Sequence, residues 1–357
     1  MNATPITSIK TRGQRKRRLA EAILARHCVK PCATAPPDPV RIVCVSDTHN
    51  KQPVLPPGDI LIHAGDLTEN GSFDEVQAGV TWLSSQPHRF KILVAGNHDV
   101  LLDEAFLERY PERRYGQSKT KQDLDWGDVI YLEDSTITLD VPVQPSPPAG
   151  AEPPTSPTGP TTTTTSRKVT IFGSPWTPQY GISAFQYPPT KGAEHWRAGL
   201  GNLVPTNTKT KPKRTRTNRD ESKHRQAAPT LVVVTHGPPR LYLDRRDALH
   251  PAGCPHLLAA LARLRPRLHV FGHIHAARGR ADVVLDGARR AHDDVLVGWA
   301  GGRGWAALAR LAVLVAWARV RRVLGLLAEE GTTTFVNAAV VGGRENELRH
   351  EAVVVEI

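Results

Sequence analysis

The feature that most constrains the fold is a series of short runs rich in valine, isoleucine and leucine, each closed by turn residues or polar residues. They are RIVCVSD (41–47), DILIHAGD (59–66), FKILVAGNHD (90–99), DVIYLED (128–134), VTIFGSP (169–175), TLVVVTHG (230–237), LHVFGHIH (268–275), TTFVNAAV (333–340) and EAVVVEI (351–357). Continuous apolar runs of this length are typical of strands that are covered on both faces. Helices are expected between some of them, at 73–85, 256–265 and 305–327. The pattern therefore predicts an α/β protein.

The length and composition predict a single domain with a leader and three insertions. Residues 41–357 form the predicted domain, and residues 1–40 a basic leader that we expect to be disordered. Two insertions, the Pro/Thr-rich segment 145–166 and the basic segment 206–227, are too polar to bury a core. The third predicted insertion, 278–330, includes an amphipathic helix.

The positive charge of the chain is concentrated in two segments. The formal net charge is +11, and residues 1–40 and 206–227 each carry eight Lys/Arg against two Asp/Glu. Each segment therefore has a surplus of six, which leaves the rest of the chain at about −1. This distribution argues against specific nucleic-acid binding by the folded body. A basic tether for RNA or an acidic membrane stays open as the alternative to a solvated tail.

Three features bear on the compartment. Four cysteines in a chain of 357 residues do not form a disulfide framework, which favours reduced thiols and a cytoplasmic location. The leader contains KRRLAEAILARH, a basic and helix-prone stretch that leaves mitochondrial or nuclear targeting open as alternatives. No run reaches the roughly eighteen apolar residues of a membrane span. The segment 305–327 is expected to pack on the protein, and an interfacial helix that contacts a membrane surface is the alternative.

Potential metal ligands follow the apolar runs directly. They are Asp47, His49, Asp66, Asn97, His236, His273 and His275, and the motif GNHD adds His98 and Asp99. In α/β sheets the carboxyl ends of the strands are where ligands bind. These seven candidate ligands offer nitrogen and oxygen atoms and no thiolate. They are more than one tetrahedral zinc site needs, and they suit two first-row cations. A carboxylate can bridge two cations, so Asp66 is the expected bridging group.

The order of these motifs resembles that of a known superfamily. D-x-H, GD, GNHD, H-G and G-H-x-H, in this order, resemble the calcineurin-like metallophosphoesterases. SDTHN, IHAGDLT, GSPWTP, LHVFGHIH and FVNA resemble its metallophosphoesterase-domain (MPPED-like) branch. The resemblance implies a four-layer αββα sandwich of two mixed β-sheets flanked by helices, with the metals at the rim of the sheets.

The resemblance also implies roles for single residues. One cation is expected on Asp47, His49 and His275, and the other on Asn97, His236 and His273, with Asp66 between them. His98 is expected to face the phosphate and to protonate the leaving oxygen, and Asp99 to orient His98. Manganese is the expected metal, with iron or zinc as alternatives. The implied reaction is in-line attack on phosphorus by a hydroxide that bridges the two metals.

The expected activity is hydrolysis of a small phosphodiester. Nucleotides are among the candidate substrates. A protein serine/threonine phosphatase-like phosphomonoesterase is one alternative, although that branch carries R-G-N-H-E where this chain has Ala95 before Gly96 and Asp99 after His98. A non-catalytic metal-binding scaffold is the other. The sequence leaves the oligomeric state open.

Several residues near the motifs have two interpretations. His63 is expected to be a core residue or to support a ligand, and Glu69 is left outside the catalytic set. Trp176 either lines the pocket or packs in the core, and Asn337 either lies near the site or ends a strand. Cys254 is expected to be a buried thiol ahead of a helix.

Overall fold

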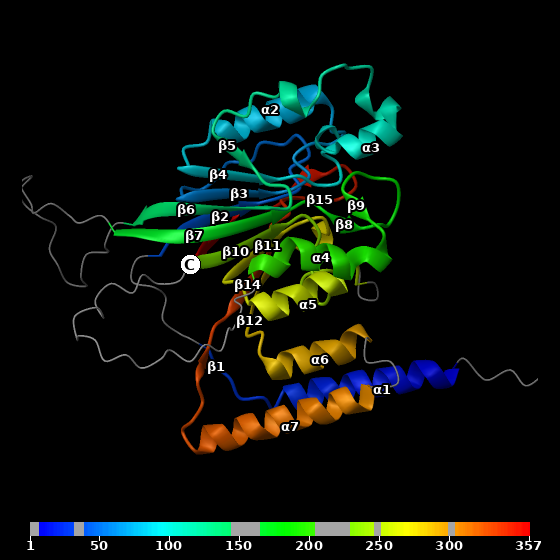
Figure 1. Cartoon of the computed structure of the whole chain (residues 1–357), viewed down its shortest axis with the longest axis vertical. Helices are drawn as coiled ribbons and strands as arrows, with labels where there is room; N and C mark the ends of the chain where they lie inside the picture. Colours follow the sequence, from blue (N-terminus) through cyan, green and yellow to red (C-terminus); the bar gives the residue numbers. More distant parts are fainter. Residues whose placement is uncertain (1–6, 32–38, 144–164, 204–228, 246–250, 299–303) are drawn as a thin grey trace, which may run out of the picture.

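Two β-sheets face each other and form the centre of the molecule (Figure 1). The computed structural model describes residues 7–31, 39–143, 165–203, 229–245, 251–298 and 304–357. One sheet has the order β17-β2-β3-β4-β5: Val353–Glu356, Arg41–Val45, Ile60–Ala64, Phe90–Val94 and Val129–Tyr131. The other has the order β12-β14-β11-β10-β7-β6: Gly279–Val283, Thr333–Asn337, Leu268–Phe271, Thr230–Thr235, Thr165–Ser174 and Ser135–Val143.

Both sheets are mixed, with parallel strands inside and antiparallel strands at edges. In the first sheet β2, β3, β4 and β5 run parallel, and β17 is antiparallel to β2. In the second, β7, β10, β11 and β14 run parallel, and β6 and β12 are antiparallel to their neighbours. The parallel strands of each sheet therefore end at one common edge, which fixes where the following loops meet.

The main core lies between the two sheets. Alternate residues of β2 point to different faces: Ile42 and Cys44 join the core shared with the second sheet, whereas Val43 and Val45 pack on the helical side. From the second sheet, Val232, Val234 and Val270 contribute to the same shared core. Because both faces of these strands are buried, their sequences are continuous apolar runs rather than alternating ones.

Helices cover the outer face of each sheet and complete four layers (Figure 1). The helices α2 (Phe73–Ser84) and α3 (Glu104–Arg109) pack on the first sheet, and α4 (Gly192–Leu200) and α5 (Pro255–Leu264) on the second. The start of α2 is fixed by a capping box between Ser72 and Glu75. The predicted αββα sandwich is therefore confirmed, and the helices predicted at 73–85 and 256–265 are present within one residue.

Three further helices form a separate small core below the second sheet in Figure 1. They are α1 (Thr7–Leu24), α6 (Gly287–Val297) and α7 (Gly304–Val323). Ala20 of α1 is buried in one cluster with Ala291 of α6 and Leu311 of α7. A short parallel pair, β1 (Lys30–Pro31) with β13 (Glu329–Glu330), joins the leader to the segment that follows α7. None of the described helices combines the length and apolarity needed to cross a bilayer.

The structure corrects several boundaries. The leader was expected to be disordered, but residues 7–24 are helical because Ala20, Ile23 and Leu24 find an apolar partner surface on α6 and α7. The insertion predicted at 278–330 begins later, since β12 is an edge strand of the second sheet. The helix predicted at 305–327 ends at Val323, before Gly325 in a left-handed conformation (φ 68°). The insertions at 145–166 and 206–227 lie outside the described residues, except that Thr165 and Ser166 begin β7.

One long strand escaped prediction. β6 has the sequence STITLDVPV, in which buried and exposed residues alternate along an edge strand. Its apolar residues are therefore separated by polar ones, and Pro142 is tolerated because an edge strand does not need every N–H. The remaining short strands are β8 (Thr177–Pro178), β9 (Gln186–Tyr187), β15 (Val341–Gly342) and β16 (Glu347–Leu348).

Two valines of α7 provide a matched test of the small helical core. Val315 is 5 % exposed and packs in the cluster, whereas Val313 is 67 % exposed on the opposite face. Val315→Ala is expected to lower the free energy of unfolding by about 2 kcal/mol more than Val313→Ala, because only Val315 loses buried methyl groups. The gain in helix propensity is the same in both variants. Denaturant unfolding followed by far-UV circular dichroism measures the difference, and equal values would contradict the described packing.

Candidate metal centre

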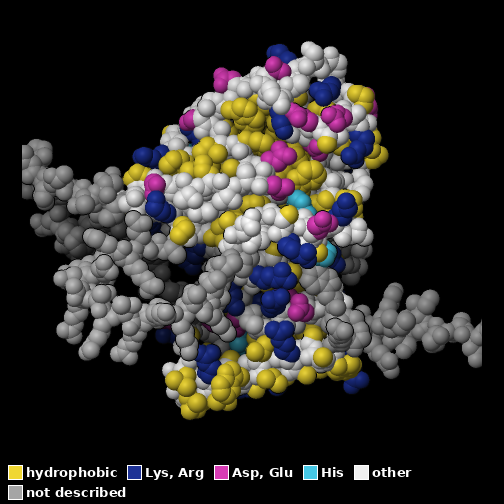
Figure 2. All heavy atoms as spheres, in the orientation of Figure 1, with side chains coloured by type: hydrophobic (Ala, Val, Ile, Leu, Met, Phe, Trp, Pro, Cys, Tyr) yellow, Lys and Arg dark blue, Asp and Glu magenta, His cyan; other side chains and the backbone are white. Residues whose placement is uncertain are grey.

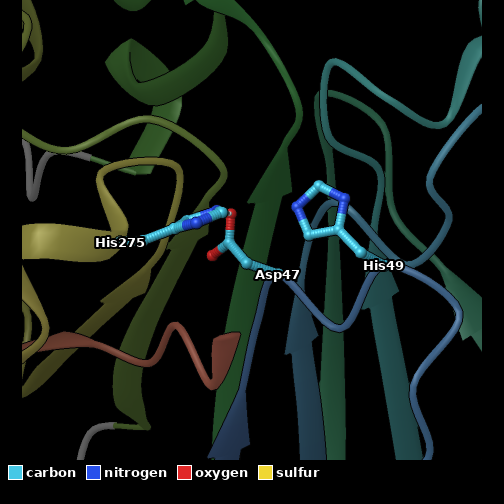
Figure 3. A group of neighbouring side chains, drawn as sticks. All are labelled: Asp47, His49 and His275. Atoms are coloured by element: carbon cyan, nitrogen blue, oxygen red, sulfur yellow. Dashed lines mark hydrogen bonds and ion pairs between the residues drawn. The ribbon is translucent and has the colours of Figure 1, made fainter. Parts of the chain in front are cut away.

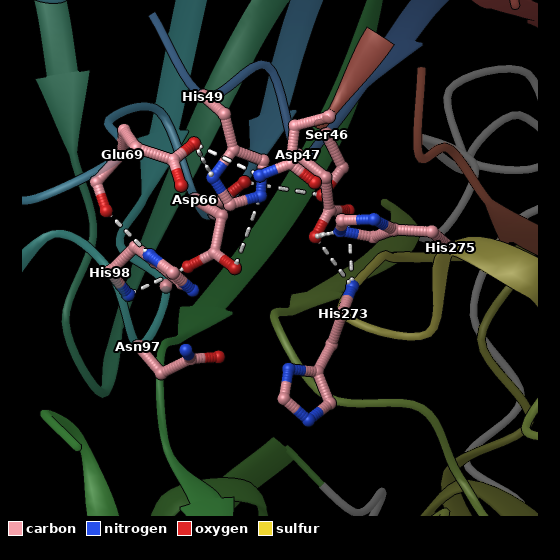
Figure 4. A network of polar contacts seen from close by, with 12 residues as sticks. Ser46, Asp47, His49, Asp66, Glu69, Asn97, His98, His273 and His275 are labelled. Atoms are coloured by element: carbon pink, nitrogen blue, oxygen red, sulfur yellow. Dashed lines mark hydrogen bonds and ion pairs between the residues drawn. The ribbon is translucent and has the colours of Figure 1, made fainter. Parts of the chain in front are cut away.

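Loops from both sheets meet at one edge and bring the predicted donors together (Figure 4). Strands β2, β3 and β4 are followed by Asp47 and His49, by Asp66, and by Asn97 and His98. Strands β10 and β11 of the other sheet are followed by His236 and by His273 and His275. Since each strand is parallel to its neighbour in its own sheet, these loops all emerge at the carboxyl edge. The site therefore lies at the seam between the two sheets.

One group of donors consists of Asp47, His49 and His275 (Figure 3). Their nearest ligand atoms all lie within 4.8 Å of one another. The Nε2 of His275 is 3.2 Å from the Oδ1 of Asp47. The Asp47 carboxylate is fully buried and also accepts a hydrogen bond of 3.0 Å from the backbone N–H of His273. This group could hold a metal ion.

A second group consists of Asp66, His236 and His273, whose ligand atoms also lie within 4.8 Å of one another. The Nδ1 of His236 donates to the carbonyl oxygen of Ala64 at 3.1 Å, so Nε2 is the ring atom directed at the other donors. That Nε2 faces two oxygens, Oδ1 of Asn97 at 2.9 Å and Oδ2 of Asp66 at 3.3 Å. These three atoms lie close enough together to hold either a proton or a metal ion between them.

Asp66 lies between the two groups (Figure 4). Its Oδ2 is 3.3 Å from the Nε2 of His236 and 3.8 Å from the Nε2 of His49. Its Oδ1 accepts a hydrogen bond of 2.8 Å from the backbone N–H of His98. One carboxylate oxygen is thus directed toward a donor of each group.

The environment of the donors fits cations rather than protons alone. Burial by itself would raise the pKa of Asp66, but His236 and the other histidines hold that pKa well below its usual value. Burial opposes protonation of His236, yet the Asp66 and Asp47 carboxylates raise its pKa to about 9. Burial lowers the pKa of His273 to about 4, so that imidazole is neutral. Ionised carboxylates that draw a proton onto a buried histidine would equally accept a divalent cation in its place.

His49 gives independent support for a cation. Its side chain is buried, and neither ring nitrogen makes a hydrogen bond within the described residues. Buried polar atoms of this kind normally have a partner. The Oε2 of Glu69 lies 3.2 Å from Nδ1, and a metal ion bound at Nε2 would give the other nitrogen its partner.

The backbone at the donors is held in an uncommon conformation. Asp47, His49, Asp66 and His273 have φ values of 53°, 44°, 54° and 68°. Left-handed backbone at residues other than glycine costs on the order of 1–3 kcal/mol each and tends to mark functional sites. Nearby glycines leave room for the donors, since a Cβ on Gly272 would overlap the Asp47 carboxylate and one on Gly96 the Asp66 carboxylate.

His98 and Asp99 have different positions in the GNHD loop. His98 is half-buried, and its Nδ1 donates to the carbonyl oxygen of Glu69 at 2.6 Å. Asp99 is 1 % exposed and accepts from the N–H groups of Gly96 at 2.7 Å and Thr68 at 2.9 Å. The His98 ring is therefore oriented by the hydrogen bond that it donates to the Glu69 carbonyl, whereas Asp99 fixes the loop backbone that carries His98. Burial and the Asp66 charge raise the pKa of Asp99 to about 6.

Three residues that the sequence left aside or did not reveal lie close to the donors. Glu69 contacts both His49 and His98, and its Oε2 accepts a hydrogen bond of 2.9 Å from Asn346. The Tyr180 ring lies 5.1 Å from the His273 ring and is 57 % exposed. Glu69 could have been found from its position three residues after Asp66, but no motif marks Tyr180 or Asn346.

The ambiguous residues also have clear places. His63 is fully buried and contacts Thr48, between two donors, at 2.9 Å. Asn337 both ends β14 and supports the site, since its Nδ2 donates to the carbonyl oxygen of Ile274 at 3.0 Å. Trp176 packs edge-on against Phe185 and His195. Cys254 is a buried thiol at the N-cap of α5, as expected.

Gly272→Ala tests the space reserved for the Asp47 carboxylate. The added methyl group would displace that carboxylate, so metal affinity is expected to fall at least about tenfold. Gly331→Ala is the matched control, because a Cβ at Gly331 would meet open space. Metal content after dialysis, measured by elemental analysis, reports the effect while circular dichroism checks folding. Equal metal content in a folded Gly272→Ala protein would exclude this role for the glycine.

Comparisons with known proteins agree with this geometry. The sequence matches the model of the family described as Calcineurin-like phosphoesterase over residues 40–277, which include all the donors named above. It is 32 % identical over 271 residues to Metallophosphoesterase domain-containing protein 1 of Homo sapiens, covering 71 % of this chain and 65 % of that protein. It is 29 % identical over 253 residues to UPF0046 protein K07C11.7 of Caenorhabditis elegans, covering 67 % and 65 %.

A further relative is much longer than this chain. The sequence is 38 % identical over 320 residues to a protein of Emericella nidulans named Probable rhamnogalacturonate lyase C. The match covers 89 % of this chain but 24 % of that protein. The chain thus spans about a quarter of this relative and less than two thirds of the other two.

Proposed function

Since this chain belongs to the calcineurin-like phosphoesterases, a family of metal-dependent phosphoester hydrolases, we propose that it is a phosphodiesterase with two metal ions. The observation that carries the proposal is the convergence of two groups of three donors, with Asn97 beside the second group and the Asp66 Oδ2 3.8 Å from His49 of the first. One ion would be held by Asp47, His49 and His275, the other by Asn97, His236 and His273, with Asp66 between them.

Manganese is the proposed metal, because histidine nitrogens combined with carboxylate and amide oxygens suit first-row divalent ions. Iron and zinc accept the same donors. When bound, the ions would supply Lewis-acid activation of the attacking water and neutralise charge on the phosphoryl oxygens.

His98 is the proposed general acid. Its Nδ1 donates a hydrogen bond to the Glu69 carbonyl oxygen, which orients the ring. Its Nε2 would then donate a proton to the leaving oxygen. Asp99 supports this role through the backbone, because it accepts hydrogen bonds from the N–H of Gly96 in its own loop and from that of Thr68 in the loop after β3.

A diester is favoured over a monoester by charge. Phosphomonoesters carry an additional negative charge, which the phosphatase branch neutralises with the arginine before its G-N-H motif. Here the buried Ala95 occupies that position. Tyr180 and Ile182, 57 % and 71 % exposed beside β8, offer an apolar surface for the second ester substituent, for example a nucleoside.

His98→Ala separates chemistry from metal binding. With manganese and a bis-phosphodiester reporter, kcat is expected to fall by about 10²–10⁴-fold because the general acid is lost, while metal content stays the same. His256→Ala, at a half-buried histidine on α5, is the matched control and should retain full activity.

Three other outcomes would contradict the assignment. Turnover of His98→Ala at the level of the unmodified protein would exclude His98 as the acid. Preferential cleavage of a phosphopeptide would indicate a phosphatase. A metal-loaded protein that cleaves neither the diester nor the phosphopeptide would indicate a binding scaffold.

Tyr180→Ala tests the substrate class. If the ring stacks on a nucleobase, KM for a nucleotide diester should rise about tenfold, whereas KM for a small diester without an aromatic group should not change. Tyr180→Phe keeps the ring and should keep the KM. An equal effect of Tyr180→Ala on both substrates would argue against base stacking.

A further inference from the structure

The helix α7 already has a packing partner on one side. Leu308, Leu311 and Val315 are 3 %, 0 % and 5 % exposed and form one cluster with Ala288 of α6 and Ala20 of α1. This buried face accounts for the stability of the three-helix unit. The opposite face of α7 therefore has no role in that core.

The opposite face is apolar as well. Because residues seven apart lie almost above one another on a helix, the exposed residues of α7 form stripes. Two neighbouring stripes in the middle of this face contain only apolar side chains: Ala306, Val313 and Val320, and Ala309, Ala316 and Val323. Val313, Val320 and Val323 are 67 %, 46 % and 85 % exposed. A helix that is apolar on both sides is expected to have a second apolar surface packed on its exposed face.

The two stripes that border this face have a different composition. One consists of Trp305, Ala312 and Arg319, and the other of Arg310, Trp317 and, just beyond the helix end, Leu324. All six residues are exposed, with Trp305 at 58 % and Trp317 at 59 %. Each border thus carries one tryptophan and one arginine beside an apolar centre. Figure 2 shows apolar side chains along the lower surface, where Figure 1 places α7.

The charges on α7 itself have one sign, although Asp294 of α6 interacts with Arg310. α7 contains Arg310, Arg319, Arg321 and Arg322 and no acidic residue. At its N-terminal end the neighbouring helix α1 adds a basic run, in which the Lys16 Nζ lies 5.5 Å from the Trp305 ring centroid. A second copy of this chain docked through the same face would add more α7 arginines and no α7 carboxylate to pair with them, which is unfavourable. Anionic headgroups would neutralise them.

We propose that the exposed face of α7 docks on a membrane surface that contains anionic phospholipids. Tryptophans and arginines at the borders of an apolar stripe are typical of helices that lie in the plane of the interface. The apolar stripes would enter the headgroup boundary, and the arginines would contact lipid phosphates. The docking does not depend on the metal centre, whose donors all lie on other elements.

Vesicle co-sedimentation of the full chain tests the proposal. Binding to vesicles of phosphatidylcholine with phosphatidylserine is expected, with at least about tenfold weaker binding to phosphatidylcholine alone. Val313→Glu combined with Val320→Glu should weaken binding to the mixed vesicles at least about tenfold, because charges replace the apolar centre. Val54→Glu is the control, since Val54 is 93 % exposed in the loop before β3.

A second pair of variants tests the charged borders. Arg310→Gln with Arg319→Gln should remove the preference for phosphatidylserine, and circular dichroism should show an unchanged fold. The proposal is overturned if the unmodified chain stays in the supernatant with mixed vesicles, or if the double-glutamate variant binds as well as the unmodified chain. A dimer in light scattering that Val313→Glu dissociates would also overturn it and would assign the face to a second copy.

Discussion

The structure depends on two ionised carboxylates placed next to each other inside the protein. Asp47 and Asp66 follow neighbouring strands and are 0 % and 2 % exposed. The loops that carry them stay paired beyond the strands, since the N–H of Asp47 donates to the Gly65 carbonyl and that of Thr48 to the Asp66 carbonyl, both at 2.9 Å. Burial and mutual repulsion both oppose ionisation of Asp47, so its low pKa depends on the surrounding histidines. Positive charge at the seam between the sheets therefore stabilises the ionised form of both buried carboxylates.

Histidines on loops of the second sheet supply that charge, and hydrogen bonds hold these loops in place. The N–H of Gly272 donates to the His236 carbonyl at 3.0 Å, and the N–H of His273 donates to Asp47, so the two sheets are joined through the donors themselves. Asn337 fixes the same loop by its hydrogen bond to Ile274. Removal of a donor would consequently disturb the contact between the sheets. The left-handed residues are tolerated because these bonds hold them from several sides.

Sequence predicted the donors because each directly follows a buried apolar run, and parallel strands bring such positions to one edge. It did not predict the role of Asp99, since hydrogen bonds to Gly96 and Thr68 depend on how two loops approach each other in space. Tyr180 was missed because it lies on a loop without a strand-end pattern. The leader helix was mistaken for disorder because its partner surface comes from α6 and α7, about 270 and 290 residues later in the chain. Donor positions marked by a local sequence pattern were predictable. The role of Asp99 and the leader helix were not, because they depend on contacts with distant parts of the chain.

The position of the helical unit explains how it can coexist with a constrained metal centre. The chain leaves the second sheet after β12 and returns at β14, and in this antiparallel pair Val283 is opposite Thr333 while Gly279 is opposite Asn337. Asn337 lies at the end of β14 that supports the donor loop, so the helices are attached at the other end of the pair. The helical segment inserted at that end can become longer or acquire a binding face without moving the metal-ligand candidates at the opposite end. The family match ends at residue 277, just before β12, which agrees with a shared metal centre and a helical unit outside it.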